Sequence, residues 1–346
     1  MIDPHFPTVP TRAPASPDDI KTRTLKIALQ MMTIARYRVA GARSFSTASG
    51  VSTVGVIGLG LMGHGIAQAA AEKGYKVVAV ELEERFLQGG LKRIGDSVKK
   101  ITSKAVEKGK MDKAVGDAHI ASTMARITAT TDRGALASCD VIIEAVIENL
   151  QLKQTLYGEI GRVVKDSCII ASNTSSLSIG TMAGYCGRPA QMIGLHFFNP
   201  VQMMKLVEVV RTDQTDPKIF ARAMEFSRSL DKTPVECIDT PGFIVNRLLV
   251  PYLTSAMLLV ERGVATPADV DTAMKLGAGH PMGPMALADY VGLDTCLSII
   301  GGWQSAFPDE PAFKVPESLR AKVAAGKLGR KTGEGFWKWD GDKLAA

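Results

Sequence analysis

A histidine and a carboxylate lie twelve positions apart within the segment Leu195–Val210, at His196 and Glu208. Alternating apolar residues precede Asn199-Pro200 and a second apolar run follows it, so the segment predicts two strands joined by a turn. Such a turn folds Glu208 back beside His196. A carboxylate against an imidazole fixes its tautomer and leaves the other ring nitrogen free to take a proton from an alcohol. The residues alone leave open a plainer alternative, a core histidine and a surface glutamate.

A glycine-rich motif upstream favours the chemical interpretation. Gly58, Gly60 and Gly63 form G-x-G-x-x-G between an apolar, β-branched run and a helix-like stretch. A second predicted strand follows and ends at Glu81, where an acidic side chain can accept hydrogen bonds from an adenosine ribose. The glycines let the backbone approach a pyrophosphate at a helix N-terminus, where free N–H groups favour anions. The motif therefore predicts a dinucleotide site, and Glu81 favours NAD because it would repel the 2′-phosphate of NADP.

The elements that must position these residues alternate along the chain. Apolar strand-like runs alternate with helix-like stretches from residue 53 to residue 237. This alternation predicts a doubly wound, mostly parallel Rossmann-type sheet of the α/β class over residues 50–240. After residue 240 only helices are expected, at residues 243–262, 266–276, 285–300 and 316–325. We interpret residues 241–346 as a smaller all-α domain whose extensive apolar faces predict a homodimer.

Composition limits the remaining classes. The chain has 346 residues and a net charge of +6, but the part after residue 49 shows no clustered basic surface with interleaved aromatic residues. Nucleic-acid binding is therefore not expected. No apolar run approaches the roughly 18 residues that a membrane span needs. The five scattered cysteines lack a C-x-x-C pair, which predicts a reducing compartment without disulfides or a zinc site.

Residues 1–49 have the composition of a mitochondrial transit peptide. No acidic residue occurs from Ile20 to Ala71, residues 25–42 can form an amphipathic helix, and residues 43–49 are basic and Ser-rich. We expect cleavage near residues 44–50 and a location in the mitochondrial matrix. A disordered basic extension is the alternative. Because the first 19 residues are acidic and Pro-rich, translation starting at Met31 or Met32 is a further hypothesis.

From about Val51 to Trp339 the chain resembles the L-3-hydroxyacyl-CoA dehydrogenases, NAD-dependent enzymes of fatty-acid β-oxidation. The motifs that carry the resemblance are Gly-Leu-Met-Gly-His-Gly-Ile-Ala-Gln at 60–68, Ser-Asn-Thr-Ser-Ser-Leu at 172–177, Leu-His-Phe-Phe-Asn-Pro at 195–200, Asp-Thr-Pro-Gly-Phe-Ile-Val-Asn-Arg at 239–247 and Gly-Arg-Lys-Thr-Gly-Glu-Gly-Phe at 329–336. The resemblance implies oxidation of L-3-hydroxyacyl-CoA to 3-ketoacyl-CoA by a homodimer of the mitochondrial short- and medium-chain type.

The resemblance also implies residue roles. His196 would be the catalytic base, Glu208 its orienting carboxylate, and Ser175 and Asn246 the groups that hold the substrate oxygen. The remaining implied contacts involve the cofactor (Gly58, Gly60, Leu61, Met62, Gly63, Glu81, Glu148, Lys153, Asn199 and Lys331) and coenzyme A (Ser97 and Lys104). Many relatives have Asp where this chain has Glu81, which puts the geometry of the ribose contact in doubt but not the preference for NAD.

Three other functions are alternatives to this one. A β-hydroxyacid dehydrogenase acting on a free acid would need a catalytic lysine, and the region around Asn246 has none. A non-catalytic binding or structural protein, like crystallin-like relatives of the family, is disfavoured by the intact set Ser175, His196, Glu208 and Asn246. A scaffold role in a larger assembly is a third possibility on which the sequence is silent.

Overall fold

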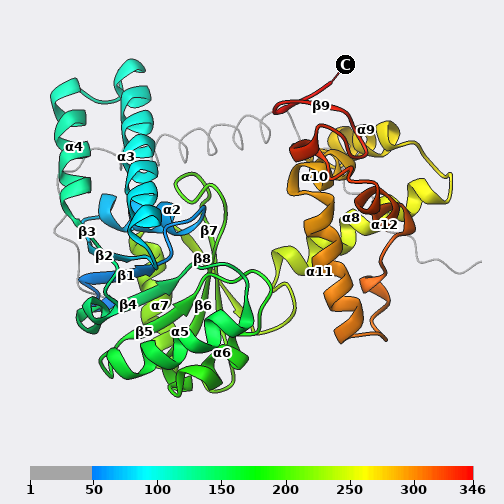
Figure 1. The fold of residues 1–346 in the computed structure, drawn as a ribbon. Helices are drawn as coiled ribbons and strands as arrows, with labels where there is room; N and C mark the ends of the chain where they lie inside the picture. Colours follow the sequence, from blue (N-terminus) through cyan, green and yellow to red (C-terminus); the bar gives the residue numbers. More distant parts are fainter. Residues whose placement is uncertain (1–48, 346) are drawn as a thin grey trace, which may run out of the picture. The chain divides into compact units, whose positions relative to one another are not determined.

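The structure is a computed structural model that describes residues 49–345 (Figure 1). Apart from Ser49, the transit-peptide-like leader and its expected helix at residues 25–42 lie outside the described residues.

A single large sheet forms the first part of the fold. Its eight strands follow the order β3-β2-β1-β4-β5-β6-β7-β8. Every neighbouring pair is parallel except β6 and β7, so the predicted mostly parallel sheet is confirmed. The strands are β1 (Thr53–Ile57), β2 (Lys76–Val80), β3 (Ile127–Thr130), β4 (Val141–Glu144), β5 (Ile169–Ser172), β6 (Met192–Phe197), β7 (Leu206–Arg211) and β8 (Thr233–Ile238).

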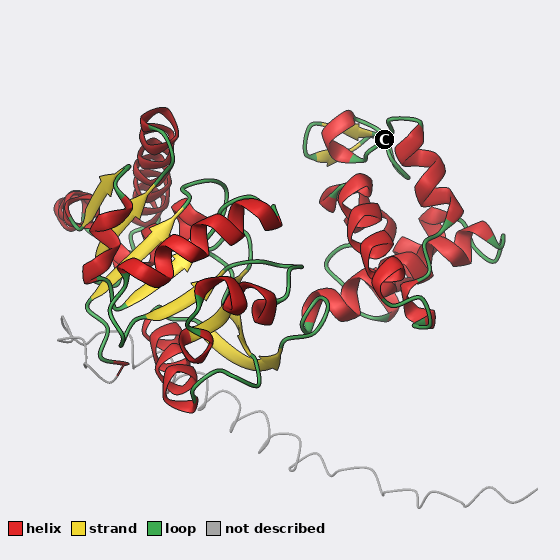
Figure 2. Ribbon diagram, turned by 60° about the horizontal axis from the view of Figure 1, so that its bottom comes forward, coloured by secondary structure: helices red, strands yellow, loops and turns green. Residues whose placement is uncertain are grey.

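Helices cover both faces of this sheet (Figure 2). One buried core packs side chains of α2, α3 and α7 against the strands, and a second core on the other face uses α5 and α6. The helices are α2 (Gly63–Glu72), α3 (Glu84–Glu107), α4 (Lys113–Ala125), α5 (Leu150–Val163), α6 (Ile179–Cys186) and α7 (Pro217–Ser229), with short 3-10 turns η2 (Arg133–Ser138) and η3 (Pro189–Gln191).

The sequence reasoning did not identify α4 and β3. Strand β3 is a four-residue edge strand, Ile-Thr-Ala-Thr, with no fully buried residue. Helix α4 has only two buried residues, Gly116 and Thr123, so it lacks the apolar stripe by which amphipathic helices are found. Weak patterning at the edge of the sheet explains why these two elements were missed.

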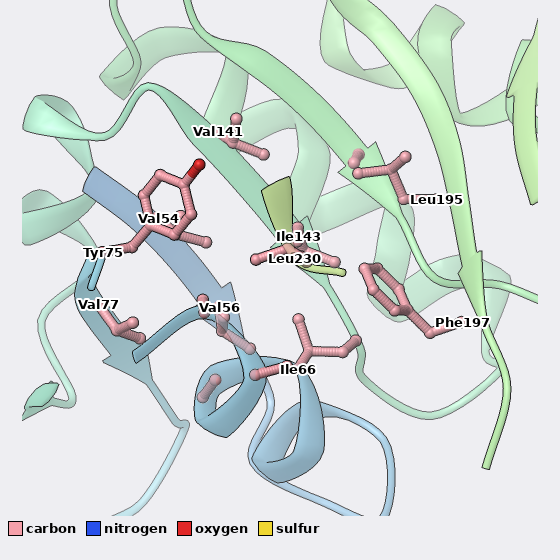
Figure 3. Close-up of a cluster of buried hydrophobic side chains, with 14 of the residues drawn as sticks. Val54, Val56, Ile66, Tyr75, Val77, Val141, Ile143, Leu195, Phe197 and Leu230 are labelled. Carbon is pink, nitrogen blue, oxygen red and sulfur yellow. The ribbon is translucent and has the colours of Figure 1, made fainter. Parts of the chain in front are cut away.

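The first core fixes α2 close to the carboxyl ends of the central strands. Ile66 of α2 contacts the cluster that contains Val56 and Ile143 (Figure 3), and all three are fully buried. Ala67 and Ala70 are also fully buried, and such small side chains allow close approach of the helix to the sheet. The N-terminus of α2 is therefore held directly after β1.

Asp140 anchors the beginning of β1 to the beginning of β4. Its carboxylate accepts hydrogen bonds from the backbone N–H groups of Ser52 and Thr53, at 2.7 and 2.9 Å, and pairs with Lys165 at 2.5 Å. Although partial burial by itself would raise the pKa of Asp140, these hydrogen bonds outweigh it and lower the pKa to about 2.

After residue 240 the chain is helical, with two departures from the expectation. The expected helix at residues 285–300 is two helices, because Gly292 adopts a φ of 103° that ends the first. The second departure is a small antiparallel hairpin of β9 and β10 beside the expected helices. The elements are α8 (Val245–Glu261), α9 (Pro267–Gly277), α10 (Pro284–Val291), α11 (Leu293–Ala306), η4 (Pro311–Phe313), α12 (Glu317–Ala324), η5 (Arg330–Thr332), β9 (Trp339–Asp340) and β10 (Lys343–Leu344).

Within residues 49–345 we find no single helix that combines the length and apolarity of a membrane span. Only α10 and α11 taken together meet that test, and they are bent by 93° where they join.

Candidate active site

Most of the predicted site residues meet where the order of the sheet reverses. The chain builds β1, β2 and β3 outward in one direction, and then β4 returns to pair with the other side of β1. In such sheets the loops at the carboxyl ends of the two central strands separate and leave a crevice that binds ligands. Here those loops begin at Gly58 and at Ala145.

The three glycines of the motif differ in what a side chain would meet. Gly58 has a φ of 87°, and a Cβ on Gly63 would lie 1.7 Å from the carbonyl oxygen of Gly58. A Cβ on Gly60 would meet nothing within 4 Å. The first and third glycines are thus required by the turn and by helix packing, whereas Gly60 keeps the surface above the N-terminus of α2 open. This arrangement fits the pyrophosphate of a dinucleotide.

A cavity of about 340 Å³ extends from this loop to Glu81. Its lining is mostly apolar and includes Leu82, Phe86 and Val146, which suits an adenine ring. Oε1 of Glu81 accepts a hydrogen bond from the N–H of Leu59 at 2.5 Å. The extra methylene of Glu81, compared with Asp, lets its carboxylate reach the glycine-rich loop.

His196 and Glu208 are direct partners in the antiparallel pairing of β6 with β7. Directly opposed residues place their side chains on the same face. Nδ1 of His196 lies 2.7 Å from Oε2 of Glu208, and the two side chains are 6% and 0% exposed. Because an ionised carboxylate only accepts hydrogen bonds, this contact assigns the proton to Nδ1 and leaves Nε2 as the acceptor. The predicted strand-turn-strand arrangement of these two residues is confirmed.

The other oxygen of Glu208 attaches the start of α8 to the site. Oε1 accepts hydrogen bonds from the backbone N–H groups of Ile244 and Val245, at 3.1 and 2.8 Å. These groups form the N-terminus of α8, where free N–H groups and the helix dipole stabilise a buried carboxylate. Asn246 follows immediately. Glu208 therefore orients His196 and also fixes the turn that presents Asn246.

Aromatic rings surround the imidazole. The ring centroids of Phe198 and Phe243 lie 4.5 and 5.7 Å from that of His196. Phe243 is buried and has a φ of 53°, a left-handed conformation that costs a bulky residue free energy. The packing against His196 and the adjoining Glu208 contacts hold Phe243 in this conformation.

A cavity of about 450 Å³ brings most of the predicted catalytic and cofactor residues together. Ser175, His196 and Asn246 all line it, and no other cavity described for residues 49–345 contains all three. It shares Gly60 and the loop after β4 with the cavity at Glu81, so the two form one continuous crevice. Further predicted residues in its lining are Leu61, Met62, Glu148 and Asn199.

Lys153 lies behind this cavity rather than in its lining. Its side chain is 1% exposed, and its Nζ lies 3.1 Å from Oε2 of Glu144 and 2.8 Å from Oε2 of Glu148. Glu148 in turn accepts hydrogen bonds at Oε1 from the hydroxyl of Thr174 and the N–H of Ser175. In this structure Lys153 therefore acts on the site through Glu148, which holds the loop that carries Ser175.

Glu144 completes this buried network. Its Oε2 also accepts hydrogen bonds from the hydroxyls of Tyr157 and Ser172, at 3.0 and 2.7 Å. Complete burial, and then the neighbouring carboxylate, raise the pKa of Tyr157 well above its usual value, so Tyr157 remains a neutral donor. A glutamate at the end of an apolar strand was the sequence signal for this network, and the sequence reasoning did not use it.

Three predicted contacts lie away from the crevice lining. Ser97 and the exposed Lys104 are two turns apart on α3, and Ser97 lies near Gln202 of the loop between β6 and β7, with an oxygen-to-nitrogen distance of 3.4 Å. Lys331 of η5 pairs with Asp294 at 2.5 Å. Their predicted roles toward coenzyme A and the cofactor stay predictions.

Asn173 is a site residue of the Ser-Asn-Thr-Ser-Ser-Leu motif at 172–177 for which the sequence indicates no individual role. Its Oδ1 accepts a hydrogen bond from the N–H of Phe197 at 2.9 Å, and it lines the active-site cavity. It therefore ties the end of β6, next to His196, to the loop after β5. Arg133 also lines the cofactor crevice, where it is paired with Glu159.

Fold and site together define an NAD-binding dehydrogenase with a histidine–carboxylate pair in the ligand crevice of a Rossmann-type sheet. Two family models cover nearly all of the described chain: the 3-hydroxyacyl-CoA dehydrogenase NAD binding domain matches residues 53–240, and the corresponding C-terminal domain matches residues 242–339. The chain belongs to the 3-hydroxyacyl-CoA dehydrogenase family, and it is an NAD-dependent enzyme of that type.

Individual relatives agree with this assignment. The mouse mitochondrial hydroxyacyl-coenzyme A dehydrogenase is 48% identical over 290 residues, which cover 84% of this chain and 91% of the mouse protein. The human protein of the same name is 46% identical over 316 residues, covering 89% of this chain and 100% of its own. The crystal structure of (S)-3-hydroxybutyryl-CoA dehydrogenase from Ralstonia eutropha superposes with a TM-score of 0.79 at 40% identity, over 84% of this chain and 99% of that one.

Proposed function

We propose that the enzyme oxidises L-3-hydroxyacyl-CoA in fatty-acid β-oxidation with His196 as the general base. The observation that carries this proposal is the pairing of buried His196 with Glu208 beside Ser175 and Asn246 in one cavity. When held in the crevice at the glycine-rich loop, NAD+ would supply the acceptor for the hydride that leaves C3 of the substrate. Nε2 of His196 takes the proton of the C3 hydroxyl, and Glu208 stabilises the resulting imidazolium. In the reverse direction the same nitrogen returns the proton to the oxygen.

The two polar residues in the cavity serve a different purpose. Ser175 and Asn246 would hydrogen-bond the C3 oxygen and fix it near Nε2 of His196. They would also stabilise the negative charge that develops on this oxygen during reduction of the ketone. The Glu208 contacts at the start of α8 and the Glu148 contact at Ser175 support these positions.

The first test is a spectrophotometric assay of the full chain with NADH and acetoacetyl-CoA. We expect rapid loss of NADH absorbance, at least about tenfold slower consumption of NADPH, because Glu81 repels the extra phosphate, and little turnover of free acetoacetate. Faster reduction of free acetoacetate than of its CoA ester would favour a β-hydroxyacid dehydrogenase. Folded protein that binds NADH without turnover would favour a non-catalytic binding protein.

We also propose a location in the mitochondrial matrix, a domain boundary near residue 240, and a homodimer formed through residues 241–346. The leader composition and the mitochondrial relatives support the location. Large apolar side chains exposed on and near α8 and α9 support the dimer, among them Leu248 at 69% and Leu276 at 82% exposure. Sedimentation velocity should give twice the chain mass at micromolar concentration, and a monomer would contradict the dimer. Import into isolated mitochondria should shorten the chain by about the predicted leader.

A further inference from the structure

The adenosine end of the cofactor crevice contains an ion pair that the glycine motif does not require. Among the residues that line the cavity of about 340 Å³, only Glu81 and Arg133 are charged. The guanidinium of Arg133 donates a hydrogen bond to Glu159 of α5, which is not part of the lining. The cavity therefore presents a cation whose counter-ion comes from a neighbouring helix.

Two adjacent strands bring Arg133 to the same end of the sheet as Glu81. Strand β3 pairs in parallel with β2, and the N–H of Glu81 donates a hydrogen bond to the carbonyl oxygen of Thr130, the last residue of β3, at 3.2 Å. The chain then turns at Asp132, whose carboxylate accepts a hydrogen bond from the N–H of Gly134 at 2.8 Å and caps η2. Arg133 is the first residue of η2, so both charged residues follow the carboxyl ends of neighbouring strands.

The core beneath the pair holds Glu159 opposite Arg133. Leu136 of η2 and the α5 residues Leu156 and Ile160 belong to one buried cluster, so the two elements pack together. The paired side chains themselves are 33% and 36% exposed. Ion pairs with this exposure contribute little to folding stability. The main effect of the pair is therefore expected on what the cavity binds.

An arginine without a partner at this place would favour the other cofactor. In sheets of this kind, an acidic residue after the second strand accepts hydrogen bonds from the ribose of NAD, whereas a nearby arginine accommodates the 2′-phosphate of NADP. A guanidinium binds phosphate through charge-assisted and often bidentate hydrogen bonds. This cavity has both residue types, Glu81 and Arg133, and their preferences oppose each other.

We propose that Glu159 is a second determinant of the choice of NAD over NADP and that it acts through Arg133. Glu159 occupies a donor of the guanidinium that a 2′-phosphate would need, and its negative charge offsets that of Arg133. Glu81 repels the phosphate directly, whereas Glu159 holds back the side chain that would attract it. Glu159 is thus a positioning residue. The inference rests on the preference for NAD proposed from Glu81 and adds a second contribution to it.

The variant Glu159→Gln tests this, because the amide keeps the size of the side chain and loses its charge. The dissociation constants of NADH and NADPH are measured by fluorescence titration of the full chain without substrate. We expect NADPH to bind about fivefold more tightly than to the wild type, and NADH to stay within about twofold. In the double variant Glu159→Gln, Arg133→Gln the gain for NADPH should disappear, because no guanidinium remains to bind the phosphate. A merely structural role would change the binding of both cofactors alike.

The matched control is Glu225→Gln. Glu225 also pairs with an arginine, Arg228, on the exposed part of α7, and it does not line the cavity at Glu81. This change removes the same charge and should leave both dissociation constants within about twofold.

An unchanged ratio of the two dissociation constants in Glu159→Gln would overturn the role of Glu159, as would a gain that persists in the double variant. An equal gain for both cofactors would show that Arg133 acts on a part common to both, and the proposal would again be wrong. Equal binding of NADH and NADPH by the wild type would instead contradict the preference proposed from Glu81. Because the titrations need no turnover, failure of the proposed reaction would be seen separately, in the assay with acetoacetyl-CoA.

Discussion

Replacing His196 with Gln should lower kcat for acetoacetyl-CoA reduction by about 10²–10⁴-fold, the usual contribution of a general acid–base. The amide can hydrogen-bond to Glu208 but cannot carry a proton to or from the C3 oxygen. The affinity for NADH should stay within about threefold, because the adenosine end of the crevice is formed by other residues, among them Glu81. Stopped-flow turnover and NADH fluorescence titration measure the two quantities separately.

His119→Gln is the matched control for this change. His119 lies on α4, where its Nε2 is 3.9 Å from Glu72, and it lines neither cofactor nor active-site cavity. It should leave kcat and the NADH affinity unchanged. Nearly full activity in folded His196→Gln would show that another group moves the proton, and the assignment of Nε2 would then be wrong.

The second large effect is expected at the glycine-rich loop. Gly63→Ala places a Cβ 1.7 Å from a backbone oxygen of Gly58, so either the loop or α2 must shift. Overpacking of this kind costs about 1–3 kcal/mol, and we expect a lower melting temperature together with NADH affinity weakened by about tenfold to a hundredfold. Thermal unfolding and NADH titration of the same preparation check both parts.

Gly60→Ala separates cofactor contact from folding. Its Cβ meets nothing within 4 Å, so the melting temperature should not fall, but the methyl group points into the surface on which the pyrophosphate would lie, and NADH affinity should drop by about tenfold. Gly184→Ala, at an open helical position in α6, is the control and should alter neither quantity. Unimpaired NADH binding in both Gly60→Ala and Gly63→Ala would place the pyrophosphate elsewhere.

Much of the site could be predicted because its signals are local. The glycine motif has to follow a strand and begin a helix, and its spacing alone indicates this. The pairing of His196 with Glu208 follows from a turn within one short segment, because opposed residues of a hairpin-like pair share a face. A feature that depends on a short stretch of chain can be predicted without knowledge of the rest of the fold.

Other features depend on residues far apart in the sequence. The resemblance implies a cofactor contact for Lys153, which stays a prediction; the structure adds that its side chain is enclosed between Glu144 and Glu148, because α5 packs its buried face against the sheet. No periodicity indicates whether a lysine on an amphipathic helix points to solvent or into a carboxylate network. The end of α10 at Gly292 could not be predicted from the sequence either, because glycine is tolerated within helices. Only the observed φ of 103° shows that Gly292 ends this helix.

The alternating architecture, the dinucleotide motif and the histidine–carboxylate pair can be predicted from the sequence, since each depends on residues that lie close together along the chain. How Ser175 and Asn246 come to lie beside His196 depends on contacts between distant segments of the folded chain. Glu148 holds the first through its N–H, and Glu208 holds the turn before the second, across separations of 27 and 37 residues. Likewise, only packing of α11 against the loops at residues 176–178 and 239–241 forms the cavity of about 500 Å³ between them. Contacts between distant segments are set by the three-dimensional packing of the whole core, which local residue patterns do not encode.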